Sequence, residues 1–223
     1  MIYSIALDGP GGAGKSSIAK QVAKQKGIVY VDTGAMYRAI ALYMLKNNID
    51  IHDQPAVVRA LSGVEISLEY RDGTQCVILN GEDVSTAIRE NPVSMAASVT
   101  SAYKEVRAFL MDTQRNVAKT TSVIMDGRDI GTVVLPDAQV KIFLSADPVV
   151  RAKRRHKELL EKGQTVDFET VLSDIQQRDW QDINRTEAPL RQADDAVLLD
   201  TSDLDFEQSV KAVLDLIEEK VGE

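Results

Sequence analysis

The chain has few of the residues that mark several protein classes. It contains one cysteine, Cys76, so no disulfide can form within the chain, and this favours a reducing compartment. Its two histidines, His52 and His156, lie far apart and have no cysteine near them, which argues against a zinc site. No apolar run approaches the roughly 20 residues of a membrane-spanning helix. The N-terminal residues show no signal-peptide pattern, so we expect a cytoplasmic protein.

Basic residues are too few for a protein that holds nucleic acid along its surface. The 223 residues include 26 Lys and Arg against 34 Asp and Glu, which gives a formal net charge of −8. Because phosphate neutralisation dominates binding to nucleic acids, this balance argues against nucleic acid and anionic membranes as partners. A small phosphorylated ligand needs only a local cluster of positive charge. No additional apolar face stands out in the sequence, and we therefore expect a monomer.

Short apolar runs alternate with helical spacing along most of the chain. The run at residues 2–7 ends at a glycine-rich turn, and helical spacing follows at 16–26. Residues 28–31 and 35–46 repeat this order of strand, turn and helix, which is typical of a parallel α/β sheet. Further strands are predicted at 122–125, 140–144 and 196–199, and further helices at 92–119, 148–162, from about 167, and at 206–220. We predict one domain over residues 1–223, with a five-stranded parallel sheet flanked by helices.

A different pattern interrupts this order at about residues 62–90. Apolar and polar residues alternate over 64–70, residues 71–74 are predicted to turn, and the run at 77–79 leads into Asn80-Gly81, a strong turn dipeptide. Alternation of this kind is typical of an antiparallel unit with one solvated face. We therefore predict a small antiparallel β insertion in the α/β pattern.

The first strand runs directly into a phosphate-binding motif. Residues 9–16, GPGGAGKS, fit the pattern G-x-x-x-x-G-K-[ST] between a predicted strand and a predicted helix. Glycines let consecutive backbone N–H groups surround an anion, and the N-terminus of the helix adds its positive dipole end. We expect Lys15 to neutralise the β- and γ-phosphates of a nucleotide and the Ser16 hydroxyl to bind Mg²⁺. The predicted ATP-binding residues are Gly9, Gly11, Gly12, Ala13, Gly14, Lys15, Ser16 and Ser17.

The motif by itself leaves two classes of protein open: a nucleotide-hydrolysing switch or motor, and a kinase for a small acceptor. The Asn-Lys-x-Asp element of guanine-specific switches is absent from the sequence. Residues 126–129, Asp-Gly-Arg-Asp, place an arginine between two aspartates at a strand end, which suits an acceptor phosphate. Phosphoryl transfer depends mostly on positioning and charge neutralisation, so a kinase needs many arginines around two phosphate groups.

Arginines are concentrated at the predicted strand ends and on the helices that follow them. Arg38 and Arg128 belong to such strand ends, and Arg178, Arg185 and Arg191 come later in the chain. The predicted helix after the fourth sheet strand carries Arg151, Lys153, Arg154, Arg155 and Lys157. For Lys153, Lys157 and Arg191 we favour a solvated surface, whereas for Arg151, Arg154 and Arg155 both a surface role and a role over the triphosphate stay open. Residues 148–165 are predicted to form a lid that excludes water.

Four motifs together resemble the bacterial cytidylate kinase family within the nucleoside monophosphate kinases. They are GPGGAGKS at 9–16, DTGAMYR at 32–38, DGRDIGT at 126–132, and RDWQDINR at 178–185 followed by Ala188-Pro189-Leu190. Their order and spacing match over essentially the whole chain, including the β-rich insertion. The resemblance implies a P-loop kinase fold, a mobile lid, and transfer of the γ-phosphoryl group of ATP to CMP or dCMP with Mg²⁺.

The resemblance also implies a role for each residue of an acceptor site. Thr33, Tyr37 and Arg38 would line the site, with threonine keeping the hydroxyl of the serine common in relatives. Ser98, Arg107 and Asp129 would contact cytosine, and Arg128 and Arg38 would hold the acceptor phosphate. Arg178 and Asp182 would contact the sugar, and Arg185 would lie beside them or on the phosphate. The implied catalytic residues are Lys15, Arg128, Arg38 and Arg154.

The chemistry of cytosine fits two of these residues. Cytosine has an exocyclic amine that Asp129 could accept from, and N3 and O2 acceptors that Arg107 could donate to. Uracil would place O4 against the carboxylate and N3–H against the guanidinium, and we expect it to be rejected. A kinase for another nucleotide, shikimate or a sugar acid, and a regulatory module that binds ATP, are the alternatives. We expect no chemistry from Trp180 or Cys76.

Overall fold

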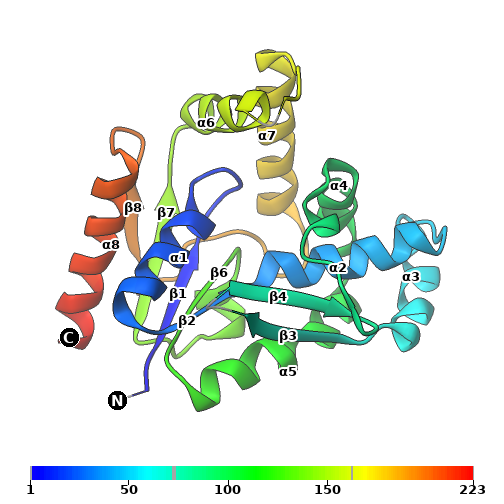
Figure 1. Ribbon diagram of the computed structural model, residues 1–223, viewed down its shortest axis with the longest axis horizontal. Helices are drawn as coiled ribbons and strands as arrows, with labels where there is room; N and C mark the ends of the chain where they lie inside the picture. Colours follow the sequence, from blue (N-terminus) through cyan, green and yellow to red (C-terminus); the bar gives the residue numbers. More distant parts are fainter. Residues whose placement is uncertain (1, 72–73, 162, 223) are drawn as a thin grey trace.

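The computed structural model describes residues 2–71, 74–161 and 163–222. Its main sheet has five parallel strands in the order β2-β6-β1-β7-β8 (Figure 1). The strands are β1 (Ser4–Asp8), β2 (Val29–Asp32), β6 (Val123–Gly127), β7 (Val140–Ser145) and β8 (Val197–Asp200). The predicted five-stranded parallel sheet flanked by helices is therefore confirmed.

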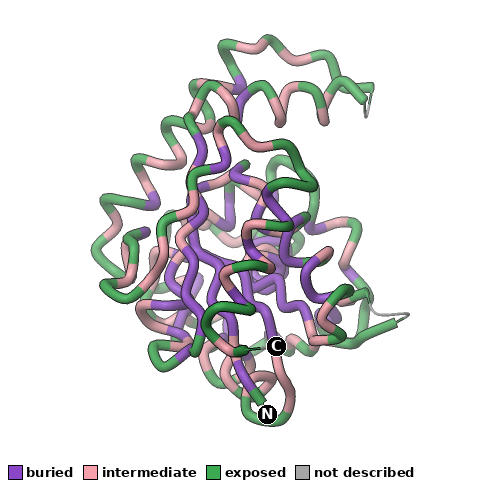
Figure 2. Tube along the Cα trace, turned by 90° about the vertical axis from the view of Figure 1, so that its left-hand side faces the viewer, coloured by how far each residue is buried: buried purple, intermediate pink, exposed green. Residues whose placement is uncertain are grey.

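Side chains along the central strand, β1, point alternately to the two faces of the sheet, and the core therefore has two layers. Ile5 and Leu7 face a cluster formed with α1 (Lys15–Lys26) and α8 (Phe206–Val221). Ala6 between them faces the opposite layer, where Met111 packs from α5 (Lys104–Thr120). Figure 2 shows the strands buried at the centre of the molecule. Because both faces of the sheet are covered at its centre, β1, β2 and β6 are mostly apolar and end at polar residues or glycine.

The antiparallel insertion is also present, as a three-stranded sheet of β3 (Ile66–Arg71), β4 (Thr74–Leu79) and β5 (Glu82–Asp83). Residues 72 and 73 of the predicted turn lie outside the described residues. Val77 and Leu79 join one apolar cluster with α2 (Thr33–Lys46), α3 (Gln54–Ala60) and α4 (Asn91–Thr100). Two side chains bind this sheet to the edge strand β2: Tyr70 donates its hydroxyl to the Tyr30 carbonyl (3.2 Å), and Gln75 accepts from the backbone N–H of Asp32 (2.9 Å).

One predicted helix is wrong in its extent. Instead of a single helix over 92–119, α4 ends at Thr100 and α5 begins at Lys104. No proline or glycine stands between them; tertiary contacts instead fix the break. The Tyr103 hydroxyl donates to the Ile51 carbonyl (2.9 Å), and a nitrogen of Arg107 donates to the Ser101 carbonyl (3.3 Å). After the break, α5 packs on the face of the main sheet that Ala6 occupies, while α4 packs against α2.

Two helices, α6 (Pro148–Glu161) and α7 (Phe168–Asn184), project beyond the ends of the strands (Figure 1). Lys162, where the sequence places the end of the first helix, lies outside the described residues. Few residues of this hairpin are buried; Arg151, Ala152, Val171 and Asp182 are the buried ones among those described. Of the part of the chain that the structure describes, no helix is both long enough and apolar enough to cross a membrane.

Candidate active site

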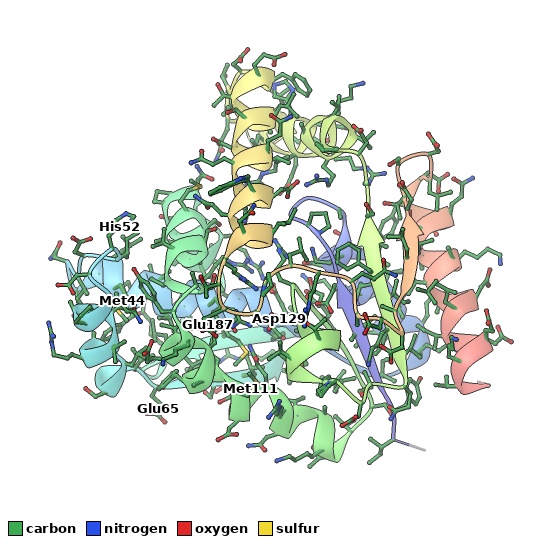
Figure 3. The ribbon with its side chains drawn as sticks, turned by 180° about the vertical axis from the view of Figure 1, so that it is seen from behind. Met44, His52, Glu65, Met111, Asp129 and Glu187 are labelled. Atoms are coloured by element: carbon green, nitrogen blue, oxygen red, sulfur yellow. The ribbon has the colours of Figure 1, made fainter. Side chains whose placement is uncertain are left out.

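A cleft of about 830 Å³ lies beyond the carboxyl ends of the strands, between the main sheet, α4 and the α6–α7 hairpin. Open parallel sheets bind ligands at this edge. The cleft brings together most of the residues that the sequence singles out: Gly12, Ala13, Gly14, Lys15, Ser16, Ser17, Thr33, Tyr37, Arg38, Ser98, Arg107, Arg128, Asp129, Arg154, Arg178, Asp182 and Arg185. Gly9 and Gly11 shape the loop without lining the cleft. In Figure 3, Asp129 lies in the interior, whereas His52 and Glu65 lie at the periphery.

The phosphate loop is fixed at its start by a close backbone contact. Gly9 has φ 147°, and a Cβ atom at this position would lie 2.0 Å from the Leu144 carbonyl oxygen. Lys15 at the end of the loop is buried and donates from Nζ to the Pro10 carbonyl (2.8 Å). Burial, together with the nearby Arg128, lowers the pKa of Lys15 to about 7. The lysine side chain thus lies back across its own loop, with its ammonium group on the Pro10 carbonyl.

We expect Gly9→Ala to lower the free energy of unfolding by about 3 kcal/mol or more, because overlap with Leu144 adds to the strained backbone conformation. Equilibrium unfolding in urea measures this difference. Gly27→Ala is the matched control: Gly27 also has positive φ (66°) but nothing within 4 Å of the added methyl group, so it should cost only about 1 kcal/mol. Equal losses in the two variants would contradict the close approach at Gly9.

The ends of β2 and β6 place two carboxylates beside the loop. Asp32 and Asp126 are paired across these parallel strands. The Ser16 hydroxyl donates to one oxygen of Asp126 (2.8 Å), and the Tyr30 hydroxyl donates to the other (2.9 Å). Burial, reinforced by the neighbouring Asp32, raises the pKa of Asp126 to about 6. A carboxylate held in this way beside a hydroxyl provides hard oxygen ligands suited to Mg²⁺.

Asp32 in turn holds two arginines at the cleft. Its Oδ1 caps α2 by accepting from the Ala35 N–H (2.8 Å), and its Oδ2 accepts from Arg38 (3.0 Å) and Arg89 (2.9 Å). Burial would raise the pKa of Asp32, but the two guanidinium groups keep it below its ordinary value. The Nε of Arg38 is buried without a partner among the described residues. Arg89 comes from the turn η2 (Ala87–Arg89) that leads out of the insertion.

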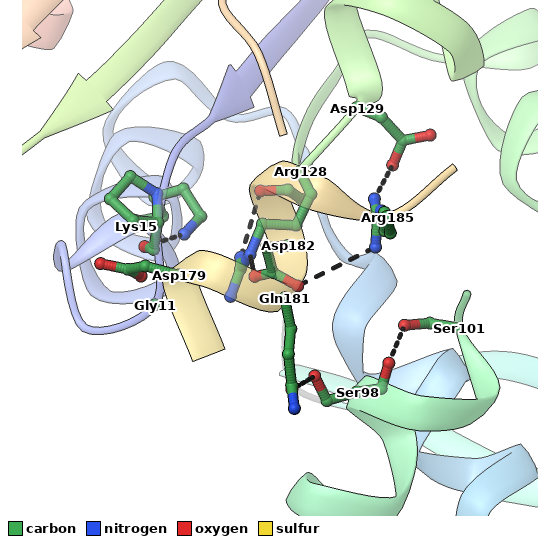
Figure 4. A network of polar contacts seen from close by, with 12 residues as sticks. Gly11, Lys15, Ser98, Ser101, Arg128, Asp129, Asp179, Gln181, Asp182 and Arg185 are labelled. Carbon is green, nitrogen blue, oxygen red and sulfur yellow. Dashed lines mark hydrogen bonds and ion pairs between the residues drawn. The ribbon is translucent and has the colours of Figure 1, made fainter. Parts of the chain in front are cut away.

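α7 and the residue after it supply further charged groups, which Figure 4 shows beside Arg128 and Asp129, directly after β6. Arg128 donates from Nε to Asp182 (2.7 Å). Arg178 has a buried Nε without a partner in the described part of the chain, and burial followed by Arg128 lowers its pKa to about 10. Arg185 donates to the Ala188 carbonyl and lies 3.8 Å from Asp129. The cleft therefore holds more guanidinium groups than its carboxylates neutralise, as a site for anions requires.

Arg107 and Asp129 form a buried ion pair that lines the same cleft as the phosphate loop. Figure 4 shows Asp129 on the other side of Arg128 and Asp182 from Lys15. The Arg107 guanidinium also lies 5.4 Å from the centre of the Tyr37 ring, within range of a cation–π interaction. On α4, the Ser98 hydroxyl donates to Gln181 of α7 (3.1 Å), as Figure 4 shows. Planar polar groups and an aromatic ring at one place suit recognition of a nucleobase by edge and face.

The three arginines left open on α6 have different surroundings. Arg154 and Arg155 line the cleft, and Arg154 donates to the Thr201 (2.6 Å) and Leu204 (3.3 Å) carbonyls after β8. Arg151 instead is buried at the base of the helix and pairs with Asp179. Sequence reasoning assigned no role to Asp8, Asp32, Asp126 or Arg89, and for Arg151 it left a surface role and a role over the triphosphate open. Three of these are aspartates at the last position of a strand or next to it, and that position was the available signal.

Asp8 acts through the backbone. At the end of β1 it accepts from the N–H groups of Ile130 (2.8 Å) and Gly131 (2.7 Å). These residues open η3 (Ile130–Val134), which directly follows Arg128 and Asp129. Asp8 therefore fixes the turn that presents both residues to the cleft. Among the described residues, no cluster of three or more His, Cys, Asp or Glu side chains could hold a metal by itself.

Comparisons with known proteins agree with this geometry. A family model described as cytidylate kinase matches residues 5–219. A cytidylate kinase from Caldicellulosiruptor bescii is 50% identical over 213 residues, covering 96% of this chain and 94% of the relative. One from Bacillus velezensis is 46% identical over 217 residues, covering 97% of each chain. Among solved structures, an uncharacterized protein from Eubacterium ventriosum has a TM-score of 0.50 at 12% identity, over 97% of this chain and 98% of that one, and is similar in fold alone.

The family match thus extends over the phosphate loop, the strand ends and both projecting helices, and the curated relatives match nearly from end to end. From its sequence and its fold, this chain belongs to the cytidylate kinase family.

Proposed function

We propose that the protein transfers the γ-phosphoryl group of ATP to CMP or dCMP, giving ADP and CDP or dCDP. The observation that carries the proposal is one cleft lined both by the phosphate loop and by the Arg107–Asp129 pair. An oxygen of the acceptor phosphate attacks the γ-phosphorus, and the bond to the oxygen that bridges to the β-phosphate breaks. The curated relatives carry the name cytidylate kinase, which supports this choice of acceptor.

The residues between the two ends of the cleft fit two phosphate groups. Lys15 and the loop N–H groups would hold the donor phosphates, and Arg154 would join them from α6. Arg38 and Arg128 would hold the acceptor phosphate, with Arg89 beside Arg38 on the same oxygen of Asp32. The three arginines are held in place before the ligand arrives, Arg38 and Arg89 by Asp32 and Arg128 by Asp182. Preorganised charge of this kind stabilises the negative charge of a phosphoryl-transfer transition state.

The remaining acceptor residues would contact the nucleoside. Asp129 would accept from the amine of cytosine, Arg107 would donate to its ring, and Ser98 would join them. Asp182 and Arg178 would contact the sugar, Arg185 would lie beside them, and Thr33 and Tyr37 would line the site. We further propose that the insertion at 62–90 forms the wall of the acceptor side, and that residues 148–165 close over the donor as a lid.

The oxygen atoms of Ser16 and Asp126, beside the phosphate loop, are suitable ligands for Mg²⁺. Ser16 and Asp126 both line the cleft and offer a hydroxyl and a carboxylate 2.8 Å apart, and Mg²⁺ takes one or two such ligands together with phosphate oxygens and water. Ser16 would bind the ion directly, and Asp126 would do so directly or through water. When bound, Mg²⁺ supplies charge neutralisation at the β- and γ-phosphates. Tyr30 would orient Asp126 for this role.

An acceptor panel tests the proposal. Purified protein with Mg-ATP should release ADP when CMP or dCMP is added, and should show little release with AMP, shikimate or gluconate. Strong stimulation by shikimate or a sugar acid would favour the alternative kinase. ADP release that is independent of any acceptor would favour a hydrolase, and ATP binding without ADP release would favour a regulatory module.

A further inference from the structure

Arg151 lies at the base of α6 and is only 2% exposed. All three nitrogens of its guanidinium group donate, to three partners from different parts of the chain. Nε donates to the Ala146 carbonyl (2.8 Å), Nη1 donates to the Gly11 carbonyl (2.9 Å), and Nη1 and Nη2 donate to the two oxygens of Asp179 (3.1 and 2.5 Å). The phosphate loop, the root of α6 and α7 are therefore joined through one planar group.

Gly11 is also where the phosphate loop approaches the arginines assigned to the acceptor. A Cβ atom at Gly11 would lie 3.5 Å from Nη2 of Arg128 and 3.7 Å from Cδ of Arg178. Arg128 pairs with Asp182, which stands three residues after Asp179 on the same helix. Residues at this spacing lie on one face of a helix. The donor loop and the acceptor residues are thus related in two ways, by hydrogen bonds through Arg151 and by the close approach of Arg128 and Arg178 to Gly11.

We propose that Arg151, with Asp179, is a positioning residue that couples the donor site to the acceptor site. The proposal rests on the proposed function. A triphosphate bound by the loop acts on the backbone of Gly11, whose carbonyl is held by Arg151. The two parallel bonds to Asp179 fix the orientation of the guanidinium group, so a shift at Gly11 moves α7 together with Arg178 and Asp182. Donor binding thereby aligns the residues that hold the acceptor.

A purely structural role for this pair gives a different expectation. A buried ion pair that only stabilises the fold would lower stability when broken, yet would leave the effect of donor on acceptor affinity unchanged. Coupling is defined by that effect and is reciprocal between the two sites. The ratio of two acceptor affinities therefore separates the two roles.

The experiment is calorimetric titration of the full chain with CMP, in Mg²⁺, with and without a non-hydrolysable ATP analogue. In the unaltered protein the analogue should tighten CMP binding about fivefold or more, within the usual range of coupling between sites. In Asp179→Asn the factor should fall below about twofold, because the amide keeps the shape but loses the charge and one acceptor oxygen. Asp215→Asn, the same change at an exposed ion pair of α8 outside the cleft, should keep the factor of the unaltered protein.

A second variant guards against a folding defect. Arg151→Lys keeps the charge but cannot form the parallel bonds, and it should also reduce the factor; thermal unfolding without ligands reports the stability of each variant. The proposal is overturned if the analogue does not change CMP affinity in the unaltered protein, or if either variant keeps the full factor. Failure of CMP to bind the unaltered protein at all would instead count against the proposed function, and with it against this coupling.

Discussion

Replacing Lys15 by alanine is expected to abolish acceptor-dependent ADP release, with kcat lowered by about 10³-fold or more. Lys15 is the charged side chain of the loop that would face the donor phosphates, and it is 5% exposed. Its Nζ atom lies across the loop on the Pro10 carbonyl, so the ammonium group is already within the loop proposed to hold the β- and γ-phosphates. Alanine leaves the backbone N–H groups but removes the one mobile charge.

The lowered pKa of Lys15 indicates that burying its charge is unfavourable in the free protein. Burial and Arg128 lower this pKa to about 7, so the free protein holds the charge at some cost. The negative charge of a bound triphosphate favours the protonated lysine and offsets that cost only when the donor is present. This is differential stabilisation by a group that fits the bound state better than the free one.

The control for this variant lies on the same helix. Lys24 is exposed and outside the cleft, so Lys24→Ala should retain the activity of the unaltered protein. Initial rates of ADP release at saturating CMP, and the affinity for ATP from a separate titration, divide the loss between binding and catalysis. Activity of Lys15→Ala within tenfold of the unaltered protein would remove Lys15 from the mechanism.

The second large effect concerns the base of the acceptor. We expect kcat/KM for CMP to exceed that for UMP by about 10³-fold or more, because uracil would leave the buried polar groups of the site wrongly paired. Arg107 and Asp129 are 6% and 5% exposed at their side chains, so neither can turn to water to recover a lost partner. Their mutual ion pair and the Tyr37 ring fix the direction of both groups. The site would therefore select CMP over UMP because uracil leaves Arg107 and Asp129 without suitable partners.

Asp129→Asn should lower kcat/KM for CMP by about 10²-fold and narrow the preference for CMP over UMP, because the amide can donate to O4 of uracil. Steady-state rates with both nucleotides measure the two ratios. Asp137→Asn is the matched control, since Asp137 is exposed, follows η3 and lies outside the cleft. Comparable turnover of UMP and CMP by the unaltered protein would sink this assignment of the base site.

The sequence predicts the elements well where local chemistry decides them. Strands β1, β2 and β6 end at the first or second residue of DGPGG, DTG and DGRD, where a buried apolar run gives way to polar residues and glycine. The predicted helix at 92–119 fails because its break depends on Ile51 and Arg107, which no local pattern relates to residues 101–103. The helix α3 was also missed, although Asp53 caps it and Pro55 lies in its first turn.

Part of the candidate site was equally visible in the sequence. The phosphate-loop motif needs only a glycine-rich turn between a strand and a helix, and DGRD and RDWQDINR carry their charges at one end of an element. Those are properties of neighbouring residues. The spacing of residues was enough to identify the donor loop, whereas the residues proposed to contact cytosine were identified through resemblance to a family.

The tertiary structure decided which of these charges meet. Asp126 meets Ser16 across 110 positions of sequence, Arg89 meets Asp32 across 57, and Arg151 meets Gly11 across 140. Parallel strands bring such distant residues to one edge through their register, and register is a property of the whole sheet. By itself, therefore, the sequence determined the chemistry available at each strand end. Only the fold decided that Arg151, among several arginines on α6, is buried against the phosphate loop while Arg154 and Arg155 face the cleft, because burial depends on what packs against a helix from elsewhere in the chain.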